Sequence, residues 1–483
     1  MRAPTHCQSA QPGLGQSLKV DWRSPRRAHF VGIAGSGMRS LAAVLLGWGW
    51  YVSGSDTAPE SVRFLAARGA KIHAGHASHY LPSGSDVLIY SDAVPESNPE
   101  RRRAAELGIP TQSYFQVLGR LMSGTRGIAV AGTHGKSTVT AMLADLLVQA
   151  GLDPAVVFGA TPIGQACGGK PGKGQVTLVE ACEYRSNFLH LRPTHAIILN
   201  IEPDHFDCFA SFAQLRQAFA RFAASVPQHG LLIVPDYLSL EWLGESGVSC
   251  GVESFGLGPQ AHWSARDLVA DQGRFRFIIS RAGKRLCQVR LQVPGRHNVL
   301  NALAAASLAW HQGVSPEQIA SGLSKFSGLH RRLENVGTRG QVIFVDDYAH
   351  HPTEVTAGLL TLRAMFPGRR LWCVFQPHQA SRTQHLLDEF AQSLQNADRV
   401  AVAEVFRARE APRRPGEVTA ADLAQRARKA GAWVAPVHTP DRIVRLLEAD
   451  LAPGDVLVTM GAGDIGKICH AFVDRLREDR AAG

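Results

Sequence analysis

The sequence predicts an α/β protein of three domains, each built on a mostly parallel sheet with flanking helices. Its 483 residues correspond to about three domains at roughly 150 residues each. Short apolar runs, typical of buried parallel strands, alternate with helical patterns in three successive blocks. No internal repeat is visible in the sequence, so a solenoid or a propeller is excluded. We place the domains at residues 28–122, 123–328 and 329–483, after an N-terminal extension over residues 1–27 that could be disordered.

The composition predicts a globular protein of the cytoplasm. Hydrophobic residues make up 45% of the chain and charged residues 19%, which excludes a disordered chain. The longest apolar stretch near the N-terminus, residues 40–52, is interrupted by two glycines and is too short to span a membrane. Residues 1–22 lack the apolar core of a secretion signal. The eight cysteines form no C-x-x-C pair, so we expect reduced thiols and neither a zinc ribbon nor a disulfide framework.

The chain is basic, with 51 Lys and Arg against 41 Asp and Glu and a formal net charge of +10. Such a charge favours nucleic acid or an acidic small substrate as a ligand. The basic residues are dispersed apart from short clusters at residues 101–103 and 331–332, and aromatic residues do not interleave with them. We therefore expect an acidic small molecule, with no nucleic acid and no membrane as partner.

The first block is predicted to begin with a βαβ unit. A strand, a Gly-rich turn, a helix and a second strand are expected at residues 29–33, 32–37, 38–46 and 50–53. The glycines from Gly32 to Gly37 read G-x-x-G-x-G, which departs from the dinucleotide fingerprint G-x-G-x-x-G. Asp56 nevertheless follows about 20 residues later, as that fingerprint requires. A glycine turn that binds nothing remains the alternative at this point.

The second block carries the strongest phosphate-binding signal. An apolar strand at residues 127–131 leads into the loop Gly132-Thr-His-Gly-Lys-Ser-Thr138 and a helix at residues 139–149. Loop amides can turn toward an anion, Lys136 supplies a positive charge, and the Ser137 hydroxyl can hold Mg²⁺. ATP or GTP is the expected ligand. Val130 stands where the full P-loop pattern has its first glycine, so a chance Gly-Lys-Ser turn is the alternative.

Two further strands of this block lead to side chains that can bind a metal. Residues 176–180 end in Glu180, and residues 196–200 lead to His205. Parallel strands place their carboxyl ends at one edge of a sheet, which also holds the phosphate loop. Mg²⁺ prefers oxygen ligands, so Glu180 with Ser137 is a candidate magnesium site. His205 is a less usual Mg²⁺ ligand, and a structural hydrogen-bonding role is equally open for it.

The third block predicts another open, mostly parallel sheet. Strands are expected at residues 342–345, 371–375, 400–403 and 456–460. They alternate with helical patterns at residues 355–365 and 382–395. Residues 461–464 form a Gly-rich loop after the last strand, at the end of the sheet where such folds bind ligands.

Six motifs in a fixed order give the chain a resemblance to a known family. They are Gly132-Thr-His-Gly-Lys-Ser, Glu180-Ala-Cys-Glu-Tyr, Asn200-Ile-Glu-Pro-Asp-His205, Gly295-Arg-His-Asn298-Val-Leu-Asn301-Ala, His330-Arg-Arg-Leu-Glu334 and Asp346-Asp-Tyr-Ala-His-His-Pro352. Together with the N-terminal glycine turn, Ser53-Gly-Ser-Asp56 and Val374-Phe-Gln-Pro-His378, they resemble the Mur ligases of peptidoglycan synthesis. The resemblance extends from about residue 29 to the last helix.

The resemblance implies an ATP-dependent ligase, most similar to the family members that add L-alanine. Such members use ATP to phosphorylate the lactyl carboxylate of UDP-N-acetylmuramate, and the amine of L-alanine then attacks the acyl phosphate. ATP, UDP-N-acetylmuramate and L-alanine are the implied partners, and Mg²⁺ is the implied cofactor. The domains would be a Rossmann-like UDP-sugar-binding domain, a P-loop-type ATPase domain and a Rossmann-like ligase domain. We expect a monomer or a homodimer.

The same resemblance assigns site residues in five groups. ATP would contact Gly132, Thr133, His134, Gly135, Lys136, Ser137 and Thr138. The UDP-sugar would contact Gly35, Ser36, Gly37, Met38 and Asp56. L-alanine would contact His350, His351, His378 and Arg382, with Gln376 beside them. The metal would be held by Ser137, Glu180 and His205. The catalytic residues would be Lys136, Glu180, His205, Asn298, Asn301, Arg332 and Asp347.

Some features depart from the family pattern or leave alternatives open. Cys182-Glu-Tyr-Arg185 replaces a more acidic run, and Ala34 replaces a glycine. No lysine occurs over residues 174–283, where ligases that add later residues place a carbamylated lysine. This absence favours the alanine-adding members and the recycling ligases that attach a murein peptide to the same sugar nucleotide. A non-catalytic sensor of UDP-sugars is the third possibility.

For three sets of residues, a purely structural role is an alternative to a role in binding or catalysis. Asn298 could cap a helix over residues 299–310 instead of facing a nucleotide. Arg331 and Arg332 could be a solvated pair. A series of three histidines could suggest a metal site, but a surface loop is expected for His73, His76 and His79.

Overall fold

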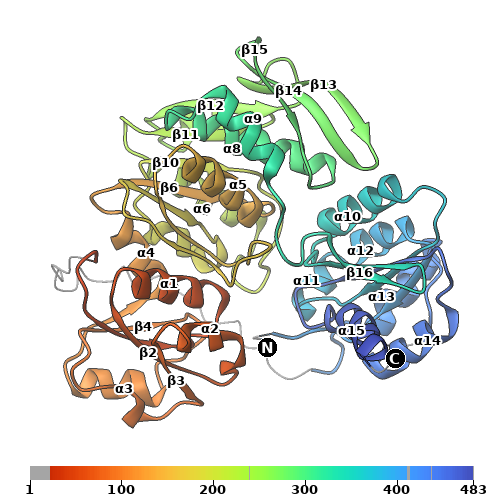
Figure 1. Cartoon of the computed structure of the whole chain (residues 1–483), viewed down its shortest axis with the longest axis horizontal. Coiled ribbons are helices and arrows are strands. Elements are labelled where there is room, and N and C mark those ends of the chain that lie inside the picture. Colours follow the sequence, from red (N-terminus) through yellow and green to blue (C-terminus); the bar gives the residue numbers. More distant parts are fainter. Residues whose placement is uncertain (1–21, 239, 409, 411–413, 437, 482–483) are drawn as a thin grey trace.

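The computed structural model describes residues 22–238, 240–408, 410, 414–436 and 438–481. These residues fold into three mostly parallel sheets flanked by helices, as the sequence predicted (Figure 1). Each sheet forms its own lobe, and in Figure 1 the first lobe is red and orange, the second yellow and green, and the third blue. Among the helices described, none has the length and apolar character needed to cross a membrane.

The first lobe is a five-stranded parallel sheet in the order β3-β2-β1-β4-β5. Its strands are β1 (Arg27–Val31), β2 (Tyr51–Asp56), β3 (Lys71–Ala74), β4 (Val87–Tyr90) and β5 (Thr111–Ser113). Its α-helices are α1 (Ser36–Gly47), α2 (Arg63–Ala66), α3 (Pro99–Glu106) and α4 (Tyr114–Met122). Two 3₁₀ helices lie at Pro59–Val62 and Ser78–Tyr80. The predicted βαβ start is therefore confirmed.

The segment before β1 packs onto the first two lobes. Residues 1–21, most of the predicted N-terminal extension, lie outside the described residues. Trp22 is 6% exposed and stacks on Trp50, with the two ring centroids 5.4 Å apart. Arg23 donates hydrogen bonds to the carbonyl oxygens of Gly172 and Gly174, which belong to the second lobe. The end of the extension thus joins these two lobes.

The three histidines expected in a surface loop do not share one. His73 lies in β3, and His79 lies in the 3₁₀ helix Ser78–Tyr80. His76 reaches inward, and its Nδ1 lies 3.1 Å from the carboxylate of Glu100, which is fully buried. Glu100 also lies 2.6 Å from His29 Nε2. The surface-loop prediction was wrong because a buried carboxylate needs hydrogen-bond donors, and His76 is one of them. The spacing of the histidines does not show that α3 places Glu100 beside His76.

The second lobe is a ten-stranded sheet in the order β15-β14-β13-β12-β11-β10-β6-β9-β7-β8. Its strands are β6 (Arg126–Ala131), β7 (Ala155–Phe158), β8 (Gly168–Pro171), β9 (Val176–Glu180), β10 (His195–Ile198), β11 (Leu231–Pro235), β12 (Gly251–Gly256), β13 (Trp263–Asp271), β14 (Arg274–Arg281) and β15 (Lys284–Arg290). The middle of the sheet is parallel, whereas β8 at one end and β14 and β15 at the other pair antiparallel. Its helices are α5 (Lys136–Gln149), the 3₁₀ helix Tyr184–His190, α6 (Phe212–Ala224), α7 (Leu240–Glu245), α8 (Arg296–His311) and α9 (Pro316–Lys325).

The third lobe is a five-stranded sheet in the order β16-β17-β20-β18-β19, in which only β16 is antiparallel. Its strands are β16 (Glu334–Arg339), β17 (Val342–Asp347), β18 (Leu371–Phe375), β19 (Arg399–Val402) and β20 (Val456–Met460). Its helices are α10 (Pro352–Met365), α11 (Ala380–His385), α12 (Leu387–Ser393), the 3₁₀ helix Leu394–Asn396, α13 (Ala420–Lys429), α14 (Pro440–Asp450) and α15 (Lys467–Ala481). The single helix predicted at residues 382–395 is divided, because Leu386 leaves helical geometry at φ −113° and ψ 27°.

The apolar strands are buried on both faces, which explains why they read as continuous hydrophobic runs. In β6, Ile128 and Val130 pack into one hydrophobic cluster, while Ala129 and Ala131 pack into another on the opposite face. Because β6 lies inside the sheet, its carboxyl end is held rigidly. The loop that follows β6 is therefore fixed relative to the ends of its neighbours β9 and β10.

Candidate active site

The turn from β6 into α5 forms the predicted phosphate loop. Helix α5 begins at Lys136, and its N-cap is Gly135 at φ +83°. Gly132 has φ +141°, and a Cβ there would lie 2.9 Å from the Cβ of Leu199. A Cβ on Gly135 would lie 2.7 Å from Asn301 Oδ1. Glycine is thus required at both positions, and the first turn of α5 presents amides that suit an anion.

Lys136 is paired with a carboxylate that the sequence analysis did not select. Its Nζ lies 3.0 Å from the carboxylate of Glu183, which is 1% exposed. The same carboxylate lies 3.4 Å from His205 Nε2. Burial alone would raise the pKa of Glu183, but Lys136 and His205 outweigh burial and hold that pKa below its usual range. The available signal was its position three residues after Glu180, directly behind β9.

Ser137 and Glu180 meet as the sequence predicted. Ser137 Oγ donates to the Glu180 carboxylate at 3.0 Å, and the backbone N–H of Gly159 donates to it at 3.1 Å. His205 follows β10 and adopts a left-handed conformation at φ +56°. The ring of Tyr184 lies edge-on to its imidazole, with centroids 5.2 Å apart. A hydroxyl and a carboxylate at the phosphate loop form the kind of oxygen-rich site that suits Mg²⁺.

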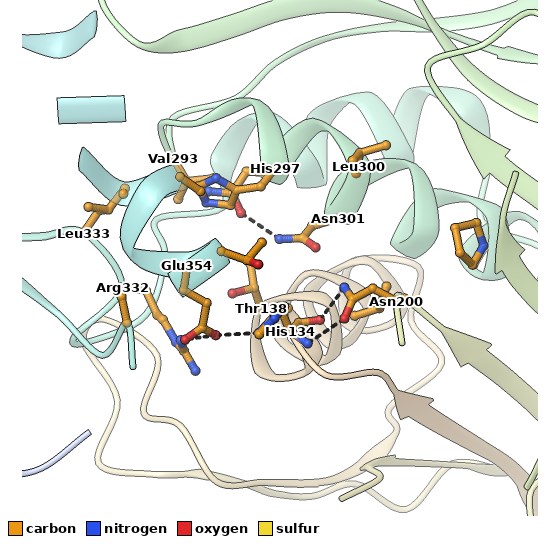
Figure 2. A pocket seen from close by; sticks show the side chains of 18 of the residues that line it. His134, Thr138, Asn200, Val293, His297, Leu300, Asn301, Arg332, Leu333 and Glu354 are labelled. Atoms are coloured by element: carbon orange, nitrogen blue, oxygen red, sulfur yellow. Dashed lines mark hydrogen bonds and ion pairs between the residues drawn. The ribbon is translucent and has the colours of Figure 1, made fainter. Parts of the chain in front are cut away.

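A cavity of about 550 Å³, which we call the loop cavity, opens beside the phosphate loop (Figure 2). It lies between the second and third lobes. Its polar lining includes His134, Thr138, Asn200, Glu202, His297, Asn298, Asn301, Arg332, Asp347 and Glu354. Apolar side chains such as Leu300, Leu333 and Val293 complete the wall. A cavity with apolar walls and a few converging polar groups is typical of a small-molecule site.

Asn298 and Asn301 both line the loop cavity from α8. Asn301 Nδ2 donates to Asn298 Oδ1 at 2.9 Å, and Asn298 Nδ2 donates to the carbonyl oxygen of Pro294 at 2.6 Å. The N-cap of α8 is Gly295. The capping interpretation of Asn298 was therefore wrong, and the two amides hold each other in place at the cavity wall.

Arg331 and Arg332 are not a solvated pair. Arg331 forms an ion pair with Asp346 at 3.2 Å and donates to the carbonyl oxygen of Gly461 at 2.6 Å. The guanidinium of Arg332 lies 4.9 Å from the ring of Tyr348 and faces the loop cavity. The alternative failed because the turn before β16 places both arginines at the carboxyl ends of β17 and β20, where Asp346, Tyr348 and Gly461 lie.

Asp347→Asn is expected to stabilise the ligand-free protein at pH 8. Asp347 is 6% exposed, and burial, only partly opposed by Arg332, raises its pKa to about 7. An unfolded aspartate titrates near about 3.9. Because the folded pKa is the higher one, the carboxyl lowers stability increasingly as pH rises from about 4 to about 7. The melting temperature of the variant should exceed that of the wild type at pH 8 and approach it near pH 4. A difference that does not change with pH would contradict this.

A second cavity of about 460 Å³ lies where the three lobes meet, and we call it the three-lobe cavity. It is lined by Gly35, Ser36, Gly37 and Met38 from the first lobe, Glu180, Tyr184 and His205 from the second, and Tyr348, His350, His378 and Arg382 from the third. Residues assigned to the UDP-sugar, the metal and L-alanine therefore line one space. Burial lowers the pKa of His350 to about 3, so this imidazole is neutral.

Ser137 does not line that space, and neither do three of the residues assigned to the UDP-sugar and L-alanine. Asp56 supports the glycine turn, since its carboxylate accepts a hydrogen bond from the Ala34 N–H at 2.9 Å. His351 caps α10 by accepting from the Thr353 N–H, and its Nε2 lies 3.2 Å from the carbonyl oxygen of Pro203 in the second lobe. Gln376 is 7% exposed and donates to Asp464 at 3.2 Å.

Arg382 joins the third lobe to the second. It is 2% exposed, and its Nε and Nη2 donate to the carboxylate of Asp204 at 2.7 and 3.2 Å. Burial would raise the pKa of Asp204, but Arg382 outweighs burial and holds that pKa far below its usual range. The remaining Nη1 donates to the carbonyl oxygen of His378 at 3.1 Å. The guanidinium therefore fixes the docking of two lobes while one edge stays at the three-lobe cavity.

Three linked α/β domains, with a phosphate loop in the second and a cavity shared by all three, define a nucleotide-dependent ligase. The family model described as Mur ligase family, catalytic domain, matches residues 27–126. The model of the Mur ligase middle domain matches residues 130–309, and that of the Mur ligase glutamate ligase domain matches residues 331–463. The chain belongs to the Mur ligase family.

Within this family, the chain is similar to relatives that are named for the addition of alanine or of a murein peptide. The UDP-N-acetylmuramate–L-alanine ligase of Salinibacter ruber is 40% identical over 475 residues, which cover 97% of each chain. That of Clostridium novyi is 38% identical over 93% of this chain and 97% of its own. The crystal structure of the UDP-N-acetylmuramate–alanine ligase of Thermotoga maritima superposes with a TM-score of 0.78 at 27% identity, covering 94% and 100% of the chains. A murein peptide ligase from Psychrobacter arcticus gives 0.70 at 27% identity, covering 93% and 98%.

Proposed function

We propose that this protein is an ATP-dependent ligase that joins L-alanine to the lactyl carboxylate of UDP-N-acetylmuramate in peptidoglycan synthesis. Relatives that carry this activity in their names are 38–40% identical over 93–97% of the chain. The observation that carries the proposal is the three-lobe cavity, because a ligase must bring a sugar nucleotide, a phosphoryl donor and an amine to one point. A recycling ligase is the second candidate, since a murein peptide ligase shares the fold at a TM-score of 0.70.

The reaction proceeds in two steps, a phosphoryl transfer followed by attack of the amine. The lactyl carboxylate oxygen attacks the γ-phosphorus of ATP, which forms an acyl phosphate and releases ADP. The amine of L-alanine then attacks the acyl carbon, the carbon–oxygen bond to phosphate breaks, and the amine loses a proton as the amide forms. Both steps bring anions together, so the protein has to supply positive charge and orientation.

ATP would occupy the loop cavity. The loop amides and Lys136 would hold its phosphates, with Lys136 exchanging its contact with Glu183 for the phosphate oxygens. Arg332 from the third lobe would add a second cation, and Asp347 would contact the nucleoside. Asn298 and Asn301 would contact the nucleotide from α8. All of these side chains except Lys136 line the loop cavity, and Lys136 follows directly on Gly135 at its wall.

The sugar nucleotide and L-alanine would share the three-lobe cavity. Gly35, Ser36, Gly37 and Met38 form the start of α1, where backbone amides suit the UDP diphosphate. His378 and Arg382 Nη1 would exchange their mutual contacts at 3.1 Å for the carboxylate of L-alanine, because Nε and Nη2 are committed to Asp204. Neutral His350 lies in the same cavity, and its pKa of about 3 makes it too weak a base to take up the proton of the amine.

The residues at the phosphate loop fit Mg²⁺, which would supply charge neutralisation for the phosphates. Ser137 and Glu180 are oxygen ligands that already contact each other at 3.0 Å. His205 lies in the same cavity as Glu180, and we propose it as the holder of a second ion. Glu183 orients His205 and Lys136 together, since its carboxylate contacts both.

We also propose that the enzyme acts in the cytoplasm as a monomer or a homodimer. The cytoplasmic location is supported by the proposed substrates, which are ATP, a soluble sugar nucleotide and an amino acid. None of these small substrates requires a nucleic acid or a membrane as partner.

An ADP-release assay with defined amines tests the function. ADP release should require UDP-N-acetylmuramate, ATP and Mg²⁺ together with L-alanine, and glycine should be poorer by roughly tenfold or more because one methyl contact is lost. Preference for the tripeptide L-alanyl-γ-D-glutamyl-meso-diaminopimelate would instead establish the recycling ligase. Tight binding of UDP-N-acetylmuramate without ADP release for any amine would establish a sensor. Both of these outcomes contradict the proposal.

A further inference from the structure

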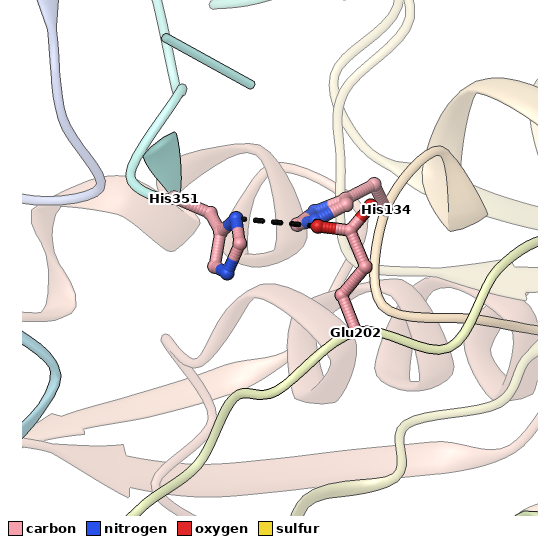
Figure 3. Close-up of side chains that lie close together, drawn as sticks. All are labelled: His134, Glu202 and His351. Carbon is pink, nitrogen blue, oxygen red and sulfur yellow. Dashed lines mark ion pairs between the residues drawn. The ribbon is translucent and has the colours of Figure 1, made fainter. Parts of the chain in front are cut away.

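His134, Glu202 and His351 bring three metal-capable atoms together between the second and third lobes (Figure 3). All three ligand atoms lie within 4.8 Å of one another. His134 lies in the phosphate loop, Glu202 follows β10, and His351 directly precedes α10. Across the described part of the chain, no other set of three His, Cys, Asp or Glu side chains meets this distance.

The hydrogen bonds around His134 leave its Nε2 available to a metal. His134 Nδ1 lies 3.1 Å from a carboxylate oxygen of Glu354, while its Nε2 is buried without a hydrogen-bond partner among the described residues. That Nε2 lies 3.4 Å from Glu202 Oε2. A histidine whose other nitrogen donates to a carboxylate is the arrangement commonly found in metal sites.

The second histidine is fixed in a similar way. His351 Nε2 lies 3.2 Å from the carbonyl oxygen of Pro203, which can only accept, so the proton belongs on Nε2. Its Nδ1 therefore carries the only lone pair, and a metal would have to displace the long hydrogen bond of 3.3 Å that this nitrogen accepts from the Thr353 N–H. The same Nδ1 lies 3.7 Å from Glu202 Oε2. The Thr353 hydroxyl holds that carboxylate in place at 2.6 Å.

We propose that His134, Glu202 and His351 form a binding site for a transition-metal dication of the zinc type, separate from the magnesium site at Ser137 and Glu180. Two imidazoles and one carboxylate are a ligand set that Zn²⁺ accepts, with water in the fourth position. Mg²⁺ prefers oxygen ligands and would not compete for it effectively. This inference goes beyond the proposed function and does not depend on it.

The site competes with a metal-free ion pair. Burial alone would lower the pKa of His134, but Glu354 and Glu202 outweigh burial and raise it to about 9, so a proton occupies this imidazole when no metal is bound. Binding of the metal has to release that proton. Because two ligands come from the second lobe and one from the third, a bound ion would cross-link the docked lobes. His134 and Glu202 also line the loop cavity, so the ion would restrict that cavity.

Titration of the ligand-free full chain with Co²⁺, in excess Mg²⁺, tests the site. One equivalent of Co²⁺ should bind with the visible d–d absorption of a low-coordinate site, and Zn²⁺ should displace it. Glu202→Gln and His351→Gln should each weaken binding by about tenfold or more. His311→Gln is the matched control, because His311 lies 3.0 Å from the Glu253 carboxylate and should bind Co²⁺ like the wild type.

Three results would overturn the proposal. They are the absence of a stoichiometric d–d band in the wild type, unchanged binding by folded His351→Gln, and a thiolate-to-cobalt charge-transfer band that assigns the ion to cysteines. Folding of each variant is checked by circular dichroism. If a variant fails to fold, zinc-edge anomalous scattering from wild-type crystals decides the site, and a peak elsewhere rejects it.

Discussion

Lys136→Ala is expected to lower turnover by about a thousandfold while leaving the affinity for UDP-N-acetylmuramate nearly unchanged. Lys136 begins α5 in the second lobe, whereas the diphosphate of the sugar nucleotide is assigned to the start of α1 in the first lobe. The loss therefore affects stabilisation of the transferring phosphoryl group and not recognition of the acceptor. Calorimetry with UDP-N-acetylmuramate and the ADP-release assay measure the two effects separately.

The structure requires a control for stability in this experiment. Removing Lys136 leaves the buried carboxylate of Glu183 without its cation, and breaking such a pair costs about 3–5 kcal/mol. The double variant Lys136→Ala with Glu183→Gln should recover melting temperature but not turnover. Near-normal turnover in either variant would exclude the assignment of Lys136 to the phosphates.

Replacement of His205 should be the second severe loss. His205→Asn is preferred to alanine, because asparagine tolerates the left-handed backbone that His205 adopts at φ +56°. Turnover per folded enzyme should fall by about a hundredfold or more even at high Mg²⁺, since a positioned ligand for the second ion is lost. The structural alternative makes His205 only a partner for Glu183, at 3.4 Å.

Melting temperature and specific activity together separate these roles. A destabilised His205→Asn protein that keeps full activity per folded molecule would refute the metal role. Glu183→Gln serves as the comparison, because it alters the same contact without removing the imidazole. Because Glu183 also pairs with Lys136 at 3.0 Å, equal losses in the two variants would assign the defect to the contacts of Glu183 as a whole and not to His205 alone.

Much of the fold could be predicted because its signals are local. The buried strand at β6 is a short apolar run, and the glycines of the phosphate loop are required by positive φ and by the close approach of Leu199 and Asn301. These constraints act within a few residues or between adjacent strands. The elements for which the sequence analysis gave bounds follow from this local pattern, except that the helix predicted over residues 382–395 breaks at Leu386. The antiparallel strands at the ends of the second and third sheets were not predicted.

The parts that could not be predicted are contacts between distant segments. Arg382 and Asp204 are separated by 178 positions, and His134 and Glu354 by 220. No spacing rule connects such residues, because their meeting depends on how the lobes dock. Glu183 was missed for a related reason. Its pairing with Lys136 appears only when β9 and the phosphate loop stand side by side.

The contact between Arg382 and Asp204 bears on whether ATP is hydrolysed before the other substrates are bound. His205 stands between Asp204, which Arg382 holds, and Phe206, whose ring stacks on His385 with centroids 4.4 Å apart. Both restraints come from the third lobe. ATP that binds while this lobe is displaced would meet a His205 that is held only by Glu183 and Tyr184 of its own lobe, without the restraints on Asp204 and Phe206. The enzyme would thereby spare ATP from futile hydrolysis by water until the acceptor and the amine are enclosed.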